Sequence, residues 1–195
     1  MTRARASLTA NDDRGITLVE LLIYIFLAIV VLTIVGSILI NSFQAERQVR
    51  DAAESNSTAQ VVAESLGLGI RNASAVEVSA PAMGSVLLRT RSIDGSDAGT
   101  WFCQAWHISN GELRTIRSTA AIPAPDAAAA ATWTLLASGV EQIGTSPFLA
   151  LGADERSVDV MLAIGVGDGV PVTLDTVMVA QQPIPATGKV TAPCF

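Results

Sequence analysis

A run of twenty residues without a charged side chain, from Leu21 to Ile40, constrains this chain more than any other feature of its sequence. As an α-helix the run would be about 30 Å long, which matches the hydrocarbon core of a bilayer. Hydrophobic residues make up 50% of the chain, and their excess is concentrated here. A buried core helix is the alternative, but an uninterrupted apolar span of this length favours a membrane segment.

The residues before the apolar run predict its orientation. Arg3, Arg5 and Arg14 precede it, and no basic residue follows it immediately. Because cytoplasmic flanks of membrane helices are enriched in arginine and lysine, we expect the N-terminus in the cytoplasm and the rest of the chain outside. No small-residue cleavage site of the A-x-A kind closes the run, so we do not expect a conventional cleaved secretory signal.

Glu20 places a carboxylate inside the apolar segment, near its start. An unpaired charge in a membrane helix is costly. Two interpretations are open. In the first, the carboxylate has no role, because it snorkels to the interface or is protonated. In the second, it meets a cation in the same apolar layer, and this partner makes its burial tolerable.

The local string from Arg14 to Leu22, read as RGITLVELL, resembles the class III signal of type IV prepilins and type II secretion pseudopilins. The resemblance implies cleavage after Gly15 by a prepilin peptidase and N-methylation of Ile16 as the mature N-terminus. It also implies that Glu20 pairs with the N-terminal amine of a neighbouring subunit. Family members usually carry Phe or Met after the cut, whereas this chain carries Ile16.

A helical pattern continues beyond the apolar run, since no proline occurs before Pro81. Spacings of four and three residues predict one face made of Val49, Ala53, Asn56, Ala59, Ala63, Leu66 and Ile70. Most of these side chains are small, which favours packing on the protein's own sheet over a partner-binding coiled coil. Gly67, Gly69 and Asn72 are stop signals, so the helix is expected to end near Arg71.

Short β-rich segments follow, and they predict an antiparallel sheet. The expected strands are Ser85 to Arg91, Trp101 to Ser109, Glu112 to Arg117, Ser157 to Ile164 and Pro171 to Ala180. Asn110-Gly111 predicts a type I′ hairpin turn, and Gly165 to Gly169 a turn between the last two strands. Ala120 to Thr132 is expected to be a surface connection, in which Ala127 to Ala131 could form one helical turn.

The expected fold class is therefore α+β, with a long N-terminal helix packed on a C-terminal antiparallel sheet, as in pilins. Four parts are predicted: a cytoplasmic leader (1–15), a transmembrane or filament-core helix (16–40), the amphipathic second half of that helix (41–73), and an extracytoplasmic β-rich domain (74–195). The succession of Trp106 to Arg117, Leu136 to Ile143 and Ser157 to Ile164 loosely resembles the larger minor pseudopilins of the J type.

The two cysteines, Cys103 and Cys194, lie 91 positions apart and form no CxxC or other metal-ligand spacing. In a domain outside the cytoplasm, a disulfide that ties the C-terminal tail to a strand is the expected reading. That tail contains Pro183, Pro185 and Pro193. Two unrelated thiols are the alternative.

Few other residues are candidates for a catalytic, metal-binding or ligand-binding site. His107 is the only histidine, and its pattern between Trp106 and Ile108 predicts an ordinary strand residue rather than a catalytic base. Residues 94–97 (DGSD) could offer oxygen ligands to calcium, but a solvated turn fits better because the distal acid of an EF-hand loop is missing. Residues 165–169 lack the lysine and helix of a phosphate-binding loop, and Trp101, Trp106 and Trp133 are expected in the core. We expect no enzyme activity, metal or cofactor.

Charge argues against direct nucleic-acid binding, because the formal net charge is −6 and Lys189 is the only lysine. The leading expectation is a structural, minor subunit of a type IV pilus, type II secretion pseudopilus or competence filament. Its partners would be sibling subunits, the prepilin peptidase, an assembly platform, and membrane lipid before assembly. The alternative is a membrane-anchored extracytoplasmic binding domain that never polymerises; a tethered hydrolase is disfavoured by the single histidine.

Overall fold

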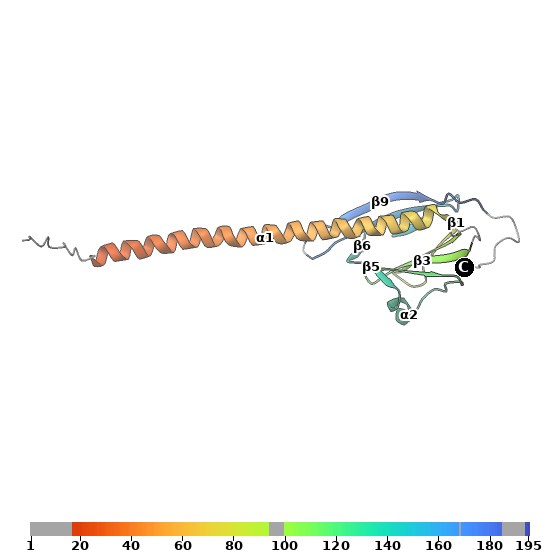
Figure 1. The fold of residues 1–195 in the computed structure, drawn as a ribbon, viewed down its shortest axis with the longest axis horizontal. Coiled ribbons are helices and arrows are strands. Elements are labelled where there is room, and N and C mark those ends of the chain that lie inside the picture. The colour runs from red at the N-terminus through yellow and green to blue at the C-terminus, as the bar shows by residue number, and fades with distance from the viewer. Residues whose placement is uncertain (1–16, 94–99, 168, 185–193) are drawn as a thin grey trace, which may run out of the picture. The chain divides into compact units, whose positions relative to one another are not determined.

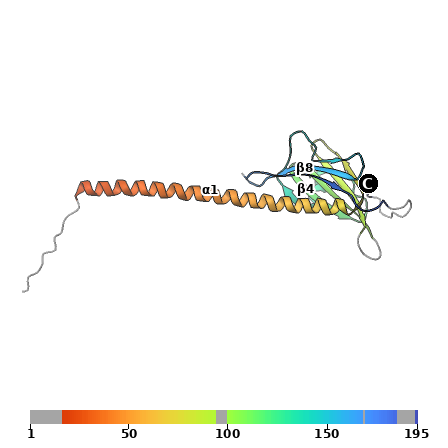
Figure 2. The same cartoon turned by 90° about the horizontal axis from the view of Figure 1, so that it is seen from above.

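A single α-helix, α1 (Leu18–Arg71), forms the N-terminal part of the computed structural model, which describes residues 17–93, 100–167, 169–184 and 194–195 (Figure 1). The chain divides into two units, one ending at Glu46 and the other beginning at Arg47. In the first unit, α1 is apolar and its side chains are exposed. In the second unit, the last turns of α1 carry buried side chains and run along two β-sheets (Figure 2).

The helix ends at Arg71, where the sequence predicts, but its glycines do not stop it. Gly67 and Gly69 lie inside α1 and are buried. The carbonyl of Arg71 would be left without an intrahelical partner at a helix end. It accepts the backbone N–H of Gln181 at 3.0 Å, so the chain that follows the last strand closes the end of the helix.

A five-stranded antiparallel sheet follows α1, with its strands in sequence order. Its strands are β1 (Ala73–Ser79), β2 (Val86–Ile93), β3 (Trp101–Ser109), β4 (Glu112–Ser118) and β5 (Thr134–Ser138). Asn110 and Gly111 join β3 to β4 with φ values of 52° and 74°. Two successive positive φ angles are the signature of a type I′ turn, so the predicted hairpin is confirmed.

A second, four-stranded antiparallel sheet completes the domain. Its strands are β6 (Val140–Gln142), β7 (Leu149–Leu151), β8 (Ser157–Ile164) and β9 (Val172–Val179). The central strand β8 pairs with β9 along its whole length and with both short strands, β6 and β7, on its other side. The predicted turn at residues 165–169 joins β8 to β9, with Asp168 outside the described residues.

The main hydrophobic core lies between the last turns of α1 and the two sheets. Val62, Leu66 and Ile70 of α1 are fully buried there, against Trp106 of β3 and Leu162 of β8. A smaller cluster covers the opposite face of the five-stranded sheet; it contains Leu87, Cys103, Ala105, Ile122, Trp133 and Cys194. Side chains of β3 therefore face both sides of the sheet, because Trp106 and Cys103 enter different clusters.

The α+β fold is as predicted, but the buried face of α1 is displaced from the predicted one. Ala59, Leu66 and Ile70 of the predicted face are buried, whereas Val49, Ala53 and Asn56 are exposed. The buried residues of α1 are Ser55, Ala59, Val62, Leu66, Gly67, Gly69 and Ile70. The cause is that burial begins only where the sheets reach the helix. The predicted strands match β2, β3, β4, β8 and β9, whereas β1, β5, β6 and β7 had no predicted counterpart.

Candidate functional site

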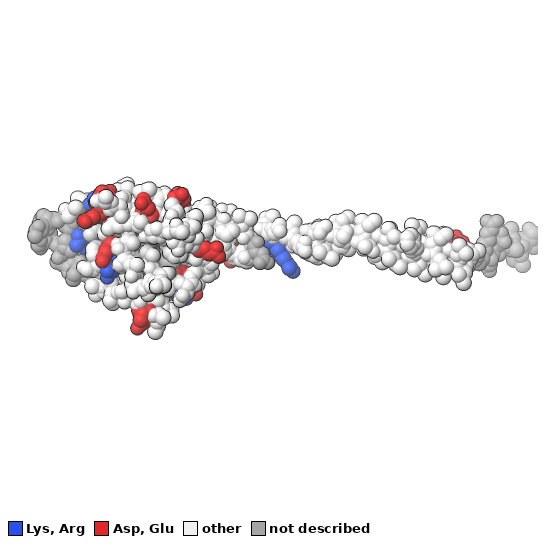
Figure 3. Space-filling model, turned by 180° about the vertical axis from the view of Figure 1, so that it is seen from behind, with Lys and Arg blue, Asp and Glu red and all other residues white. Residues whose placement is uncertain are grey.

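The apolar part of α1 is the most distinctive surface of the chain. Leu32, Phe26 and Ile40 are 69%, 66% and 60% exposed, although their side chains are hydrophobic. By length and composition, α1 is the one helix of the described chain that can cross a membrane. On the face drawn in Figure 3, residues 17–45 are almost entirely white, because Glu20 is their only charged residue. A single-pass membrane anchor is compatible with these features.

Glu20 lies in the first turn of α1, where two other side chains fix its position. The hydroxyl of Thr17 accepts the backbone N–H of Glu20 at 3.3 Å, which makes Thr17 the N-cap of the helix. The phenolic hydroxyl of Tyr24 donates to Oε1 of Glu20 at 3.0 Å. The carboxylate therefore lies beside the first turn of the helix and is exposed. Gly15 and Ile16, the predicted processing site, lie outside the described residues.

A disulfide joins Cys103 of β3 to Cys194, as the sequence predicts, with a Cα–Cα distance of 5.3 Å. Both cysteines are buried in the smaller hydrophobic cluster. The carbonyl of Cys194 accepts the N–H of Ile122 at 3.3 Å. Arg89 donates to the carbonyl of Ile122 at 3.1 Å and lies 5.8 Å from the ring centroid of Phe195. The end of the chain is thus fastened to the outer face of the five-stranded sheet.

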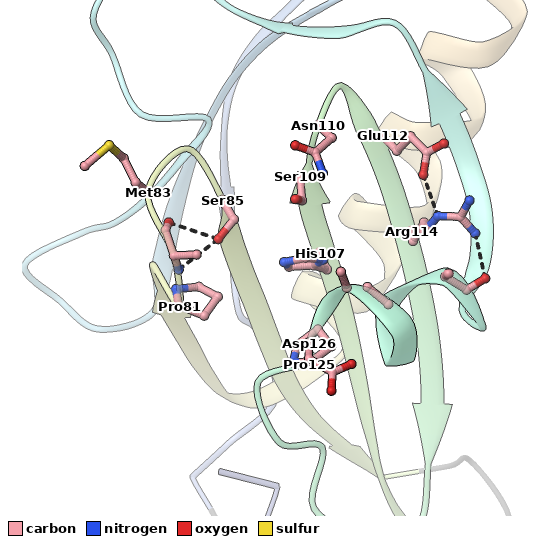
Figure 4. Close-up of a pocket in the computed structure, with 14 residues that line it drawn as sticks. Pro81, Met83, Ser85, His107, Ser109, Asn110, Glu112, Arg114, Pro125 and Asp126 are labelled. Atoms are coloured by element: carbon pink, nitrogen blue, oxygen red, sulfur yellow. Dashed lines mark hydrogen bonds and ion pairs between the residues drawn. The ribbon is translucent and has the colours of Figure 1, made fainter.

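A groove of about 380 Å³ opens on the same outer face, between the β1–β2 turn and α2 (Ala127–Ala131). In Figure 4, His107 lies between α2 and the β1–β2 turn, which carries Ser85, with Asp126 on one side and Ser109 on the other. The His107 side chain is 6% exposed, and its ring meets Trp133 edge-on at 6.1 Å. Burial lowers the pKa of His107 below its ordinary value, so the ring is neutral at pH 7.

The other polar groups of the groove are mostly engaged. Arg114 donates to Glu112 at 2.7 Å and to the carbonyls of Ala131 and Trp133 at 3.2 Å and 3.0 Å. Asp126 caps α2 by accepting the N–H of Ala129 at 2.7 Å. Within the described residues, the ring nitrogens of His107 have no hydrogen-bond partner. The groove could therefore bind a small polar group through His107, but it holds no nucleophile in hydrogen-bond contact with that ring.

Residues 94–97, for which the sequence favours a solvated turn over a calcium site, lie outside the described residues. Elsewhere in the described chain, no group of three His, Cys, Asp or Glu side chains is placed to hold a metal ion. The turn between β8 and β9 contacts α1 instead: the buried hydroxyl of Ser55 accepts the N–H of Val166 at 3.0 Å. This contact gives the turn at residues 165–169 a structural role.

Trp106 is fully buried and Trp133 is 7% exposed, so both belong to the core as expected; the indole N–H of Trp106 donates to Ser65 at 3.0 Å. Trp101 is half-buried at the start of β3, and Arg91 lies 5.7 Å from its ring centroid.

The contacts of two side chains of α1, Tyr24 and Ser55, were not predicted from the sequence. Tyr24 is the only tyrosine, and its spacing of four residues from Glu20 is a signal that could have found it. Ser55 gives no such signal, because a serine on a helix is ordinarily exposed. Comparison with protein-family models, with curated proteins and with solved structures finds no match for this chain.

Proposed function

We propose that this chain is a structural, non-enzymatic subunit of a type IV pilus, a type II secretion pseudopilus or a competence filament, and a minor subunit of it. The observation that carries the proposal is the exposed apolar part of α1 with a single carboxylate, Glu20, in its first turn. Such a surface needs lipid or other apolar helices around it. Membrane lipid surrounds it before assembly, and sibling subunits surround it afterwards.

The proposed mechanism begins with cleavage after Gly15 on the cytoplasmic side by a prepilin peptidase, followed by N-methylation of Ile16. The protein is then a single-pass protein of the cytoplasmic membrane, with its N-terminus in the cytoplasm. Extraction into an extracytoplasmic filament packs the apolar helices side by side, on an assembly platform driven by a separate ATPase. Glu20 pairs with the N-terminal amine of a neighbouring subunit, which neutralises both charges in an apolar layer.

Processing is the first test of the proposal. In a host that contains a prepilin peptidase, mass spectrometry of the mature protein should give a chain that begins at Ile16, with or without a methyl group. The same host without the peptidase provides the control and should give the unprocessed chain. A chain that still begins at Met1 in the peptidase-positive host would refute the proposal.

Glu20→Ala is the second test, with Glu64→Ala as the matched control, because Glu64 is an exposed acid on the other unit's part of α1. If Glu20 only snorkels, its removal should be harmless or should ease membrane insertion. If it neutralises an amine, the Glu20 variant should insert and fold normally but be poorly incorporated into sheared filaments. Incorporation equal to that of the wild type would remove Glu20 from the mechanism.

A membrane-anchored binding domain that never polymerises is the second candidate function. The groove around His107 favours this candidate, since the buried ring has no hydrogen-bond partner among the described residues and is free to form a hydrogen bond with a ligand. The two candidates differ at Gly15, because an anchor that does not polymerise has no need of cleavage there. The groove itself is compatible with both.

A further inference from the structure

Tyr24 stands out among the exposed residues of the apolar helix. It is the only tyrosine of the chain, and it lies four residues after Glu20, the only charged residue of the segment 17–45. Residues at this spacing face the same side of a helix. Its hydroxyl donates to Oε1 of Glu20 at 3.0 Å, so a hydrogen bond joins the two side chains across one turn of α1.

The hydrogen bond determines where the carboxylate points. Thr17 and Glu20 have the spacing of a capping box, in which the acid turns back toward the N-cap and binds its backbone N–H. Here Thr17 makes its half of that arrangement, whereas the Glu20 carboxylate is held by Tyr24. The carboxylate is therefore directed along the helix and away from the beginning of its own chain.

We propose that Tyr24 is a positioning residue for subunit assembly. By donating to Oε1, it holds the Glu20 carboxylate away from the beginning of its own chain and leaves Oε2 to receive the N-terminal amine of a second subunit. A hydrogen bond to an ionised acceptor is stronger than one between neutral groups, and more so where water is scarce. The inference rests on the proposed function, because it assigns a role within the pairing of subunits.

Tyr24→Phe removes the hydroxyl and keeps the ring. We expect this variant to be inserted and processed normally, and to be incorporated into filaments about tenfold less than the wild type, equivalent to about 1.4 kcal/mol. Thr33→Val is the matched control. It also removes a hydroxyl from the apolar helix, but that hydroxyl donates to the carbonyl of Ile29 at 2.7 Å and is far from Glu20 in sequence. Its incorporation should equal that of the wild type.

A double variant separates positioning from a general effect of the hydroxyl. Tyr24 acts through Glu20, so Tyr24→Phe added to Glu20→Ala should lower incorporation no further than Glu20→Ala alone. An equal loss in the presence and absence of Glu20 would overturn the inference. So would wild-type incorporation of Tyr24→Phe in a system where Glu20→Ala is poorly incorporated.

A spectroscopic measurement tests the contact without assembly. In the processed, full chain in detergent micelles, the ¹³C chemical shift of the Glu20 carboxyl carbon at fixed pH should change in Tyr24→Phe and stay constant in Thr33→Val. An unchanged shift in Tyr24→Phe would overturn the inference directly. If the shift changes but Glu20→Ala assembles as the wild type does, the proposed pairing of subunits fails, and the role assigned to Tyr24 fails with it.

Discussion

The two halves of α1 belong to one continuous helix, but the side chains of the first half are exposed, whereas the second half is packed against the sheets. Leu66 in the second half is fully buried by the sheets, whereas Leu32 in the first half is 69% exposed. Removing apolar surface from water stabilises by about 25 cal/mol per Å², so the second half derives its stability from within the chain. The first half can gain that stabilisation only from lipid or from other molecules. Substitutions in the two halves should therefore affect different measurements.

The largest expected effect lies wholly within the packed unit. Replacing both Cys103 and Cys194 by alanine removes a cross-link that closes a loop of 91 residues. In the chain-entropy model this lowers the free energy of unfolding by about 4.6 kcal/mol. Denaturation of the full chain in detergent, followed by tryptophan fluorescence, measures the loss.

The apolar half provides the control for this prediction, because the disulfide does not involve it. Membrane association of the cysteine variant, measured by fractionation, should equal that of the wild type. An unfolding free energy that does not change would show that the contacts of Ile122 and Arg89 hold the C-terminal residues without the disulfide.

A matched pair of leucine substitutions tests whether only the second half of α1 is packed within the domain. Leu66→Ala creates a cavity in the core and should lower the unfolding free energy of the domain by about 3 kcal/mol. Leu32→Ala removes an exposed side chain and should leave that free energy unchanged. Equal destabilisation by the two variants, measured by denaturant titration in the same detergent, would contradict the division of α1 into two surfaces.

The sequence predicted those parts of the fold that depend on local pattern. The helix end at Arg71, the hairpin at Asn110-Gly111, and the exact bounds of β3 and β8 follow from periodicity and turn chemistry. The three-residue strands β6 and β7 were missed, because their extended conformation depends on pairing with β8. Pairing of this kind brings together segments distant in sequence, and no local signal reports it.

The sequence predicted which residues belong to the candidate site, but not how their side chains are arranged in space. Glu20 and the cysteine pair followed from the charge pattern and the expected compartment. The hydrogen bond from Tyr24 and the buried position of His107 beside α2 depend on side-chain directions. The buried stripe of α1 differs from the predicted one for a related reason: Ser55 is buried where the β8–β9 turn meets α1, and its hydroxyl accepts the N–H of Val166, 111 residues later in the chain.

Substitution of one glycine in each half of α1 should change the unfolding free energy less than the leucine substitutions do, and again only in the packed half. A Cβ at Gly69 would overlap the indole ring of Trp106, so Gly69→Ala forces the core to shift and should cost about 2 kcal/mol. A Cβ at Gly36 meets nothing within 4 Å, so Gly36→Ala should only raise helix propensity, by less than about 1 kcal/mol. Helix content and unfolding free energy, measured on both variants, test the prediction. Tolerance of Gly69→Ala would mean that Trp106 can move.

The smallest expected effect is a dependence on pH that only the packed unit should show, since His107 is the only histidine. Burial lowers the pKa of His107 from 6.5, so the unfolded state binds more protons than the folded state between the lowered pKa and about 6.5. The free energy of unfolding should therefore fall as the pH drops from 7 into that window, and level off below the lowered pKa. Asp154 does not interfere, because hydrogen bonds from Ser157 and Arg156 lower its pKa to about 2.

His107→Gln isolates this contribution, because glutamine keeps polar atoms in the groove but does not titrate. Between pH 5 and 7 the variant should show a flatter profile of unfolding free energy than the wild type, whereas both proteins should remain equally membrane-associated. Parallel profiles would mean that the His107 ring is protonated as easily in the folded domain as in the unfolded chain. The ring would then be in contact with water, and the groove would have lost the buried, neutral imidazole that favours a binding function.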